Sequence, residues 1–412
     1  MRTNDLIHFC PPARLVFGCG SRAQLPALLA RLSYRHGILI TDSFFTERTP
    51  WVAEYVEAAA RLGIETLVFD GGEPDPTTTL CDEATARIRT ALGNAVPDHV
   101  IALGGGSNID LAKALCLTLP EGRAVHEFIA PTPCAPRCLP LIALPTTAGT
   151  GSEATPGAIL VDPANATKVA VMDNQLRPVI ALIDPEFTYT CPPRVTADSG
   201  IDALTHAIES YLTQDSFEFD RGGSADPGYS GRTSLTMMFA REAISLCAQF
   251  LLRTFNDGGD TEARIGMAYA SHYAALSYGS AGLNAVHGIA YAVAGQTHRS
   301  HGSTNAVMLP YVLDALRETR YAELLEIARL FGISKPDERA AVAAVPRMIC
   351  SLVGQLGIPT TLRDFGIAEQ DLPALTADAL AVTRLAKAFP VCDTAGSYAG
   401  IVRRAWDGTF LE

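Results

Sequence analysis

An aspartate and a histidine four residues apart are the first residues in the sequence whose types and spacing could do chemistry. Asp202 and His206 lie within residues 199–209, where apolar residues recur at helical spacing. On a helix, residues i and i+4 share one face, so this carboxylate and imidazole can converge on one metal ion. A surface contact between the two side chains is the alternative that the pair alone leaves open.

Two later histidines extend this candidate metal site. His287 and His301 lie in a segment rich in glycine and small residues, which permit close helix packing or sharp turns. One carboxylate with three imidazoles suits Fe2+ or Zn2+ and argues against Mg2+ or Ca2+, which prefer oxygen ligands. His298, three residues before His301, is a further candidate. His272 lies among alanines and is expected to be an ordinary buried histidine.

Two segments rich in glycine and hydroxyl groups are suited to binding phosphate. Residues 104–107, Gly-Gly-Gly-Ser, follow an apolar run and open a helix, whose free N–H groups favour an anion. The spacing matches neither the G-x-G-x-x-G fingerprint nor a Walker A loop, and a tight strand-to-helix turn is the alternative. Residues 145–153 combine threonine, serine and glycine, which suits a pyrophosphate or a ribose. Two such segments after neighbouring strands favour a dinucleotide.

Asp42 bears on which dinucleotide binds. It ends an apolar strand, where a carboxylate can bond the two ribose hydroxyls and would repel a 2′-phosphate. A helix N-cap is the alternative role for an aspartate at this point. If Asp42 contacts the ribose, the cofactor is NAD rather than NADP.

The first half of the chain contains the elements that would position these segments. Short apolar runs at 37–41, 66–69, 99–103 and 139–144 alternate with helical patterns at 51–62, 79–92 and 108–117. This alternation is typical of a parallel sheet that helices cover on both faces. Ligands of such sheets bind beyond the carboxyl ends of the strands, where the candidate cofactor residues lie.

After about residue 192 the strand signals stop. Helical patterns follow at 197–212, 236–255, 262–276, 321–330 and 340–356, and the glycine-rich, polar residues 220–231 predict a long surface loop or lid. We therefore expect an α/β dinucleotide-binding domain with a Rossmann-like parallel sheet over residues 1–190. An all-helical domain that binds metal and substrate is expected over residues 191–412.

Composition excludes several classes of function. The chain has 412 residues, of which 48% are hydrophobic and 18% charged, and this composition is globular rather than disordered. Its net charge of -12 disfavours nucleic acid and anionic membrane surfaces as partners. No apolar run has the length of a membrane helix, and residues 1–21 lack a signal-peptide pattern. A soluble, cytoplasmic protein is expected.

The ten cysteines do not suggest a disulfide framework in a chain of this length. Cys116 and Cys247 lie within helical patterns, where buried thiols act as small hydrophobic groups. Cys134 and Cys138 have the spacing of a metal-binding pair. Because they lie in a proline-rich linker and no second pair follows, we do not expect zinc there.

Together these segments resemble the iron-containing (group III) alcohol dehydrogenase family, from about residue 12 to beyond residue 310. The matching parts are 104–107 with Asp110 and Lys113, then 145–153, 184–185, 199–209, 287–288, 301–302, 305–306 and 309–310. The resemblance implies an active site in the cleft between an N-terminal dinucleotide domain and a C-terminal helical domain. It further implies a homodimer that transfers a hydride between NAD and a small primary alcohol or aldehyde.

The resemblance also assigns residues. Asp202, His206, His287 and His301 match the four metal ligands, which makes the metal-free maleylacetate reductase branch a weaker alternative. Asp42 matches a position linked with NAD preference. The predicted cofactor-binding residues are Gly104, Gly105, Gly106, Ser107, Asp110, Thr146, Thr147, Thr150, Ser152 and Lys168.

One departure from the family pattern concerns proton transfer. Many members carry a second histidine four residues after the third ligand, where this chain has Tyr291. The substrate proton is expected to leave through water, Tyr291 or His298. Tyr291 and the insertion around residues 227–231 are closer to the hydroxyacid–oxoacid transhydrogenase branch.

In that alternative a 4-hydroxy acid exchanges a hydride with a 2-oxo acid through bound NAD. Arg299 or Arg232 could bind the substrate carboxylate, although Arg232 is expected to be a solvated loop residue. Glycerol-1-phosphate dehydrogenases and dehydroquinate synthases share the implied architecture but use a different ligand pattern. A non-enzymatic binding module would leave four convergent ligands without a role.

Overall fold

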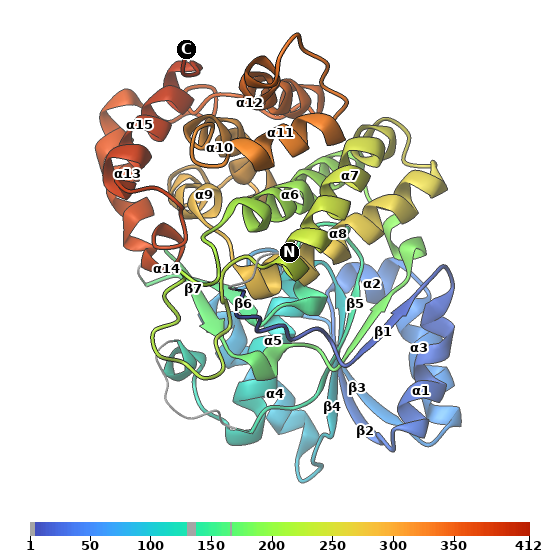
Figure 1. Ribbon diagram of the computed structural model, residues 1–412. Coiled ribbons are helices and arrows are strands. Elements are labelled where there is room, and N and C mark those ends of the chain that lie inside the picture. Colours follow the sequence, from blue (N-terminus) through green and yellow to red (C-terminus); the bar gives the residue numbers. More distant parts are fainter. Residues whose placement is uncertain (1–4, 130–136, 165–166) are drawn as a thin grey trace. The chain divides into compact units, whose positions relative to one another are not determined.

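The computed structural model describes residues 5–129, 137–164 and 167–412, which form two compact units (Figure 1). One unit is Cys10–Tyr189, and the other is Thr190–Glu412 together with the chain before Cys10. Cys134 lies outside the described residues. The nine cysteines within them form no disulfide, as predicted from the composition.

The unit Cys10–Tyr189 is built on a parallel sheet of six strands, in the order β1-β8-β5-β4-β2-β3. The strands are β1 (Arg14–Phe17), β2 (His36–Ile40), β3 (Glu65–Phe69), β4 (His99–Gly104), β5 (Leu141–Pro145) and β8 (Ile180–Ile183). A separate antiparallel pair consists of β6 (Gly157–Asp162) and β7 (Thr167–Met172). The predicted parallel sheet is therefore confirmed.

Both faces of the sheet are covered because its central strands are apolar after their first residue, which is His36 in β2 and His99 in β4. Side chains alternate between faces, so Ile38 and Ile40 enter one core and Leu39 enters the other. Each fully buried aliphatic side chain contributes about 1.5–3 kcal/mol to stability. The first core lies against α4 (Thr78–Leu92) and α5 (Gly106–Glu121), and the second against α1 (Leu25–Arg31) and α3 (Trp51–Arg61) (Figure 1). The short helix α2 (Ser43–Arg48) follows β2.

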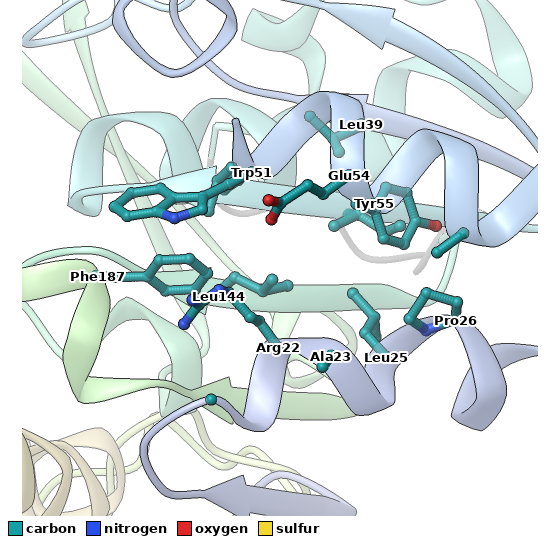
Figure 2. A pocket seen from close by; sticks show the side chains of 14 residues that line it. Arg22, Ala23, Leu25, Pro26, Leu39, Trp51, Glu54, Tyr55, Leu144 and Phe187 are labelled. Atoms are coloured by element: carbon teal, nitrogen blue, oxygen red, sulfur yellow. The ribbon is translucent and has the colours of Figure 1, made fainter. Parts of the chain in front are cut away.

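The second core contains a cavity of about 340 Å³. Trp51 and Tyr55 of α3 lie on one side of this cavity, and Arg22 and Leu25 lie across from them (Figure 2). Ala58 of α3 and apolar side chains of β2, β4 and β5 also line it. None of the predicted cofactor residues contributes to the lining, so the cavity is separate from the candidate phosphate-binding loops.

The second unit contains no strand in the described residues 190–412. Its helices are α6 (Pro193–Leu212), α7 (Ser234–Asn256), α8 (Thr261–Ala281), α9 (Ala285–Thr297), α10 (His301–Ala315), α11 (Tyr321–Leu330), α12 (Glu338–Gln355), α13 (Leu372–Ala381), α14 (Thr383–Ala386) and α15 (Thr394–Asp407). Residues 220–231 form neither helix nor strand, as predicted. Every residue of α6 from Gly200 to its end is buried, and α6 packs against α7, α8 and α10.

Five of the described helices of this unit, α7, α8, α9, α12 and α15, begin after a residue whose side chain accepts from a free N–H group. Thr233 and Thr236 form a reciprocal capping box at α7, and Asp260 caps α8. By length and composition, α7 is the one described helix that could span a membrane. It packs against α6, α8 and α11, and one such helix is weak evidence for a membrane span.

Candidate functional site

The structure brings Asp202, His206, His287 and His301 together in one cluster within the helical unit. Their ligand atoms all lie within 4.8 Å of one another. Asp202 Oδ1 is 3.7 Å from His206 Nε2 and 3.8 Å from both His287 Nε2 and His301 Nε2. The two nitrogens His206 Nε2 and His287 Nε2 are 3.1 Å apart.

These separations fit one divalent transition-metal ion. Four ligands arranged tetrahedrally at about 2.0–2.2 Å from zinc or iron would be about 3.4 Å from one another. Three imidazole nitrogens with one carboxylate oxygen are also the donor types that such ions prefer. His272 is buried on α8 and does not belong to the cluster, which agrees with the expectation for it.

Three helices supply the four ligands. Asp202 and His206 are one turn apart on α6, as the i, i+4 spacing predicted, while His287 lies in the first turn of α9 and His301 begins α10. Gly302 allows α10 to start close to α6, because a Cβ there would lie 2.0 Å from the Asp198 carbonyl oxygen. The expectation that glycines permit close helix packing is thus confirmed at this position.

The electrostatics of the cluster favour an ionised Asp202 and an uncharged His287. Burial alone would raise the pKa of Asp202. The nearby imidazoles of His206, His301 and His287 act in the opposite direction, and the pKa lies below its ordinary value. Burial lowers the pKa of His287 to about 4. At neutral pH the His287 ring is therefore uncharged and carries a lone pair for a metal.

Three residues beside the ligands were not identified from the sequence. Asn305 Nδ2 lies 2.8 Å from Asp202 Oδ1, 3.1 Å from His287 Nε2 and 3.2 Å from His301 Nε2. The ring of Tyr278 stacks on His206, with centroids 4.2 Å apart. Glu209 contacts Nδ1 of His287, and its i+3 spacing from His206 was a signal that could have revealed it.

The two residues predicted to move the proton lie in different surroundings. The Tyr291 ring is 5.7 Å from that of His301 and 6.2 Å from that of His287, and the Arg384 guanidinium lies over it at 6.0 Å. His298 ends α9 in a left-handed conformation with φ of 51° and is exposed. The Tyr291 ring therefore lies beside His287 and His301 of the cluster, whereas His298 is not part of the cluster.

The expectation that Arg232 is a solvated loop residue is wrong. Its side chain is 1% exposed and donates to Asp215 at 2.9 and 3.3 Å. It also lies 2.9 Å from Glu323. A buried guanidinium needs carboxylate partners, and Asp215 and Glu323 neutralise the charge of Arg232. Arg299 lies over the Phe365 ring at 5.8 Å.

In the other unit, the glycine-rich turn after β4 lies directly against the threonine-rich loop after β5. Gly104 has a φ of 149°, and a Cβ there would lie 2.1 Å from the Asn108 amide nitrogen. A Cβ on Gly106 would lie 2.6 Å from a side-chain carbon of Thr150, whereas one on Gly105 would make an ordinary contact with Thr147. The N–H groups at the start of α5 remain available to an anion.

Two predicted cofactor residues, Ser107 and Lys168, share a partner that the sequence did not indicate. Ser107 Oγ accepts from the Asp75 N–H at 3.2 Å, and Lys168 Nζ lies 2.6 Å from Asp75 Oδ1. Asp75 itself has a left-handed backbone with φ of 51°. Asp75, in the segment between β3 and α4, therefore contacts both predicted cofactor residues.

Asp110 and Ser152 hold the threonine-rich loop against α5. Asp110 Oδ1 accepts from Ser152 Oγ and Oδ2 accepts from the Ile159 N–H, both at 2.9 Å. One turn later, the fully buried Lys113 donates to Thr155 Oγ1 at 3.1 Å and to the Gly157 carbonyl at 2.8 Å. The contacts that the structure gives for Asp110 and Ser152 are therefore with other groups of the protein.

Asp42 fulfils the alternative role considered for it. Its carboxylate caps α2 by accepting from the Phe44 N–H at 3.0 Å, and it accepts from Asn108 Nδ2 at 2.7 Å. A carboxylate has about four acceptor sites, so these two bonds leave capacity for a ribose hydroxyl.

Comparison with known proteins identifies the family to which this arrangement belongs. Residues 12–185 match the family model described as Iron-containing alcohol dehydrogenase. Residues 229–393 match the model described as Fe-containing alcohol dehydrogenase family, C-terminal. The chain belongs to the iron-containing alcohol dehydrogenase family. The resemblance seen in the sequence is confirmed.

Individual members of this family match over most of the chain. Long-chain-alcohol dehydrogenase 1 of Geobacillus thermodenitrificans is 34% identical over 97% of this chain and 98% of its own length. NAD-dependent methanol dehydrogenase of Bacillus methanolicus is 30% identical, with 90% and 92% covered. The crystal structure of a 1,3-propanediol oxidoreductase superposes with a TM-score of 0.87 at 27% identity, covering 97% of this chain and 100% of that one.

These relatives confirm the Rossmann-like α/β unit with an all-helical unit and support an alcohol oxidoreductase. The donor set of the cluster agrees with the metal that the family name implies. Neither the family nor the paired Arg232 favours the transhydrogenase alternative.

Proposed function

We propose that this protein is a metal-dependent dehydrogenase that transfers a hydride between a small primary alcohol or aldehyde and NAD. The observation that carries the proposal is the cluster of Asp202, His206, His287 and His301. Fe2+ is the proposed ion and Zn2+ is the alternative, because the ligand types suit both. A divalent ion held there would act as a Lewis acid toward the oxygen of the alcohol or carbonyl group.

The chain's own residues would fix the ion and orient the substrate. The four ligands come from rigid helices, so their geometry is set before binding and needs little reorganisation during the reaction. The buried surroundings of Asp202, His206 and His287 exclude water, which strengthens electrostatic interactions with the substrate. Tyr291, whose ring lies against His301, is the proposed carrier of the hydroxyl proton toward solvent.

The proposed NAD site lies at the turn after β4 and the loop after β5. The α5 N-terminus with Gly105 and Gly106 would hold the pyrophosphate, and Thr146, Thr147 and Thr150 would donate to the cofactor. The nicotinamide supplies the hydride acceptor. The reaction requires this group to reach the substrate at the metal cluster.

NAD is proposed over NADP because of Asp42, whose carboxylate would repel a 2′-phosphate. A sulfoacetaldehyde reductase of 25% identity, with a TM-score of 0.82 and 97% of this chain covered, was solved with NAD+. The family also includes an NADPH-dependent butanol dehydrogenase from Clostridium saccharobutylicum, 29% identical over 89% of this chain. The preference therefore has to be measured.

The substrate partner is proposed to be a small alcohol, aldehyde or hydroxy acid, and the protein to be a cytoplasmic homodimer that binds neither nucleic acid nor membrane. The net charge of -12 supports the exclusion of nucleic acid and anionic membranes.

The test uses protein prepared without air and loaded with Fe2+. NADH or NADPH formation is followed from 1-butanol and from 4-hydroxybutyrate, each with and without 2-oxoglutarate. We expect NADH from the alcohol, loss of activity with a chelator, and a slower rate with NADP. Product formed only with the 2-oxo acid, with no net NADH, would contradict the proposal in favour of transhydrogenation.

A further inference from the structure

Glu209 lies behind the metal cluster, three residues after His206 on α6. Its side chain is 2% exposed and contacts Nδ1 of His287, the ring nitrogen opposite the ligand atom. We propose that Glu209 is a positioning residue, which sets the tautomer of His287 and thereby makes its Nε2 a metal ligand. This inference rests on the proposed metal-dependent function and extends it to a residue outside the ligand set.

The orientation of the Glu209 carboxyl group is fixed by the backbone of α9. Glu209 Oε1 accepts from the Asn284 N–H at 3.0 Å and from the Val286 N–H at 2.9 Å. These donors lie at the N-terminus of α9, where an acceptor is required and the helix dipole favours negative charge. The second oxygen, Oε2, is therefore the one that faces His287.

With Glu209 ionised, Oε2 accepts a hydrogen bond from Nδ1 of the neutral His287 ring, so Nδ1 carries the proton and Nε2 keeps a lone pair. Nε2 faces the cluster, at 3.1 Å from His206 Nε2 and 3.8 Å from Asp202 Oδ1. The opposite tautomer would direct an N–H into the space where a cation has to bind. A carboxylate behind a histidine ligand fixes the ring and raises its basicity.

The substitution Glu209→Gln tests this role with little change in size. The backbone N–H groups of Asn284 and Val286 need an oxygen acceptor, so the glutamine Oε1 has to take that position. Its NH2 group then faces Nδ1 of His287 and donates to it, which moves the ring proton to Nε2. The helix cap survives, but the ligand atom is blocked.

Two further variants separate positioning from packing. Glu209→Asp keeps a carboxylate but is one methylene shorter, so it should bind metal more tightly than the glutamine variant. If Glu209 acted through packing alone, the glutamine variant, which keeps the length of the side chain, would bind metal more tightly than the aspartate variant. Asn284→Ala removes a side chain that caps α9 at the Ala285 N–H and donates to the Glu209 carbonyl, while the backbone N–H that holds the Glu209 carboxyl group stays. It should lower the thermal unfolding temperature more than it lowers metal affinity.

The measurement is Zn2+ affinity, obtained by competition with a chromophoric chelator on the full-length, metal-free protein. We expect a loss of about 10- to 100-fold in Glu209→Gln. The Asp variant should lose less than tenfold, and Asn284→Ala less than threefold. Glutamine and wild-type affinities within threefold of each other would overturn the role of Glu209. Failure of the wild type to bind Zn2+ or Fe2+ would overturn this inference and the proposed metal function together.

Nuclear magnetic resonance of the Zn2+-loaded wild type gives a second readout that does not depend on the variants folding. In protein labelled with 15N-histidine, the Nδ1 proton of His287 should be hydrogen-bonded and slow to exchange with water. Its signal is assigned by its loss in His287→Asn. Absence of such a protected proton would contradict the proposal.

Discussion

At the scale of single residues, Lys113 is a fully buried basic side chain. Its side chain is 0% exposed and donates to Thr155 and Gly157 beneath the threonine-rich loop. Burial lowers the pKa of Lys113 to about 8, despite the opposing influence of Asp110. The ordinary value of 10.5 holds in the unfolded chain, so the unfolded state binds more protons between these two pH values.

This difference predicts how stability depends on pH. The cost of burying charged Lys113 is present below pH 8 and disappears as the pH rises toward 10.5. Between pH 8 and pH 9.5 wild type should gain about 1.5 kcal/mol of unfolding free energy relative to Lys113→Met. Denaturant unfolding of both proteins at each pH measures this gain. A constant difference between the two would contradict the lowered pKa.

Replacement of Tyr291 should affect turnover. Because its ring lies against His301, Tyr291→Phe should lower kcat about 100-fold, as expected for loss of a proton carrier, without reducing bound metal. His298→Ala, which changes an exposed residue at the end of α9, is the control and should change kcat less than threefold. If the pH profile of Tyr291→Phe matches that of wild type, water carries the proton.

Spacing alone predicted that Asp202 and His206 share one helix face, and the structure confirms this placement. The sequence did not indicate which residues hold the loop after β5. Asp110 matched a family position, yet its two oxygens bind Ser152 and Ile159 of the same unit. Glu209 was missed because a glutamate in a helix is common and its partners lie some 75 to 78 residues away.

At the scale of elements, the close approach of two loops explains the glycines after β4. Gly105→Ala should be tolerated by the fold, since its Cβ would make an ordinary contact, but should weaken NAD binding about tenfold if backbone and phosphate approach closely. Gly106→Ala should also lower the unfolding temperature, because its Cβ would clash with Thr150. Unchanged NAD affinity in Gly105→Ala, measured by fluorescence titration, would place the phosphate elsewhere.

The cavity beneath α3 predicts a gain in stability (Figure 2). Ala58 lines this apolar space, so Ala58→Leu should fill part of it and add about 1 kcal/mol to the unfolding free energy. Ala60→Leu on the exposed side of the same helix is the matched control and should gain nothing. Equal urea midpoints for the two variants would show that the space cannot accept the side chain.

Long periodic elements were predictable, and short or small-residue elements were not. The pattern at 321–330 coincides with α11, and that at 51–62 differs from α3 by one residue. β1 and β8 have four residues each, too few to show a period. α9 and α10 were not predicted because neither shows the apolar stripe that marks a helix: α9 is rich in alanine and glycine, and α10 is buried from Gly302 to Asp314.

For the whole molecule, composition and resemblance predicted a two-part globular enzyme, and the family is now established. Substrate choice did not follow from sequence, and the packing of loops such as residues 220–231 has no periodic signal. Part of that loop is buried, with Ser230 and Gly231 bonded to the carbonyls of Ser280 and Ala281. Such long-range contacts become apparent only in the folded chain.

In the proposed reaction, one ion at the four-residue cluster supports alcohol oxidation. The most direct test adds Fe2+ stepwise to metal-free protein under anaerobic conditions and records the rate of alcohol-dependent NAD reduction. We expect no activity without metal and a linear rise that ends at one ion per chain. His206→Ala should stay inactive at the same additions. Full activity in the metal-free protein, or in this variant, would show that the cluster is not needed for alcohol oxidation.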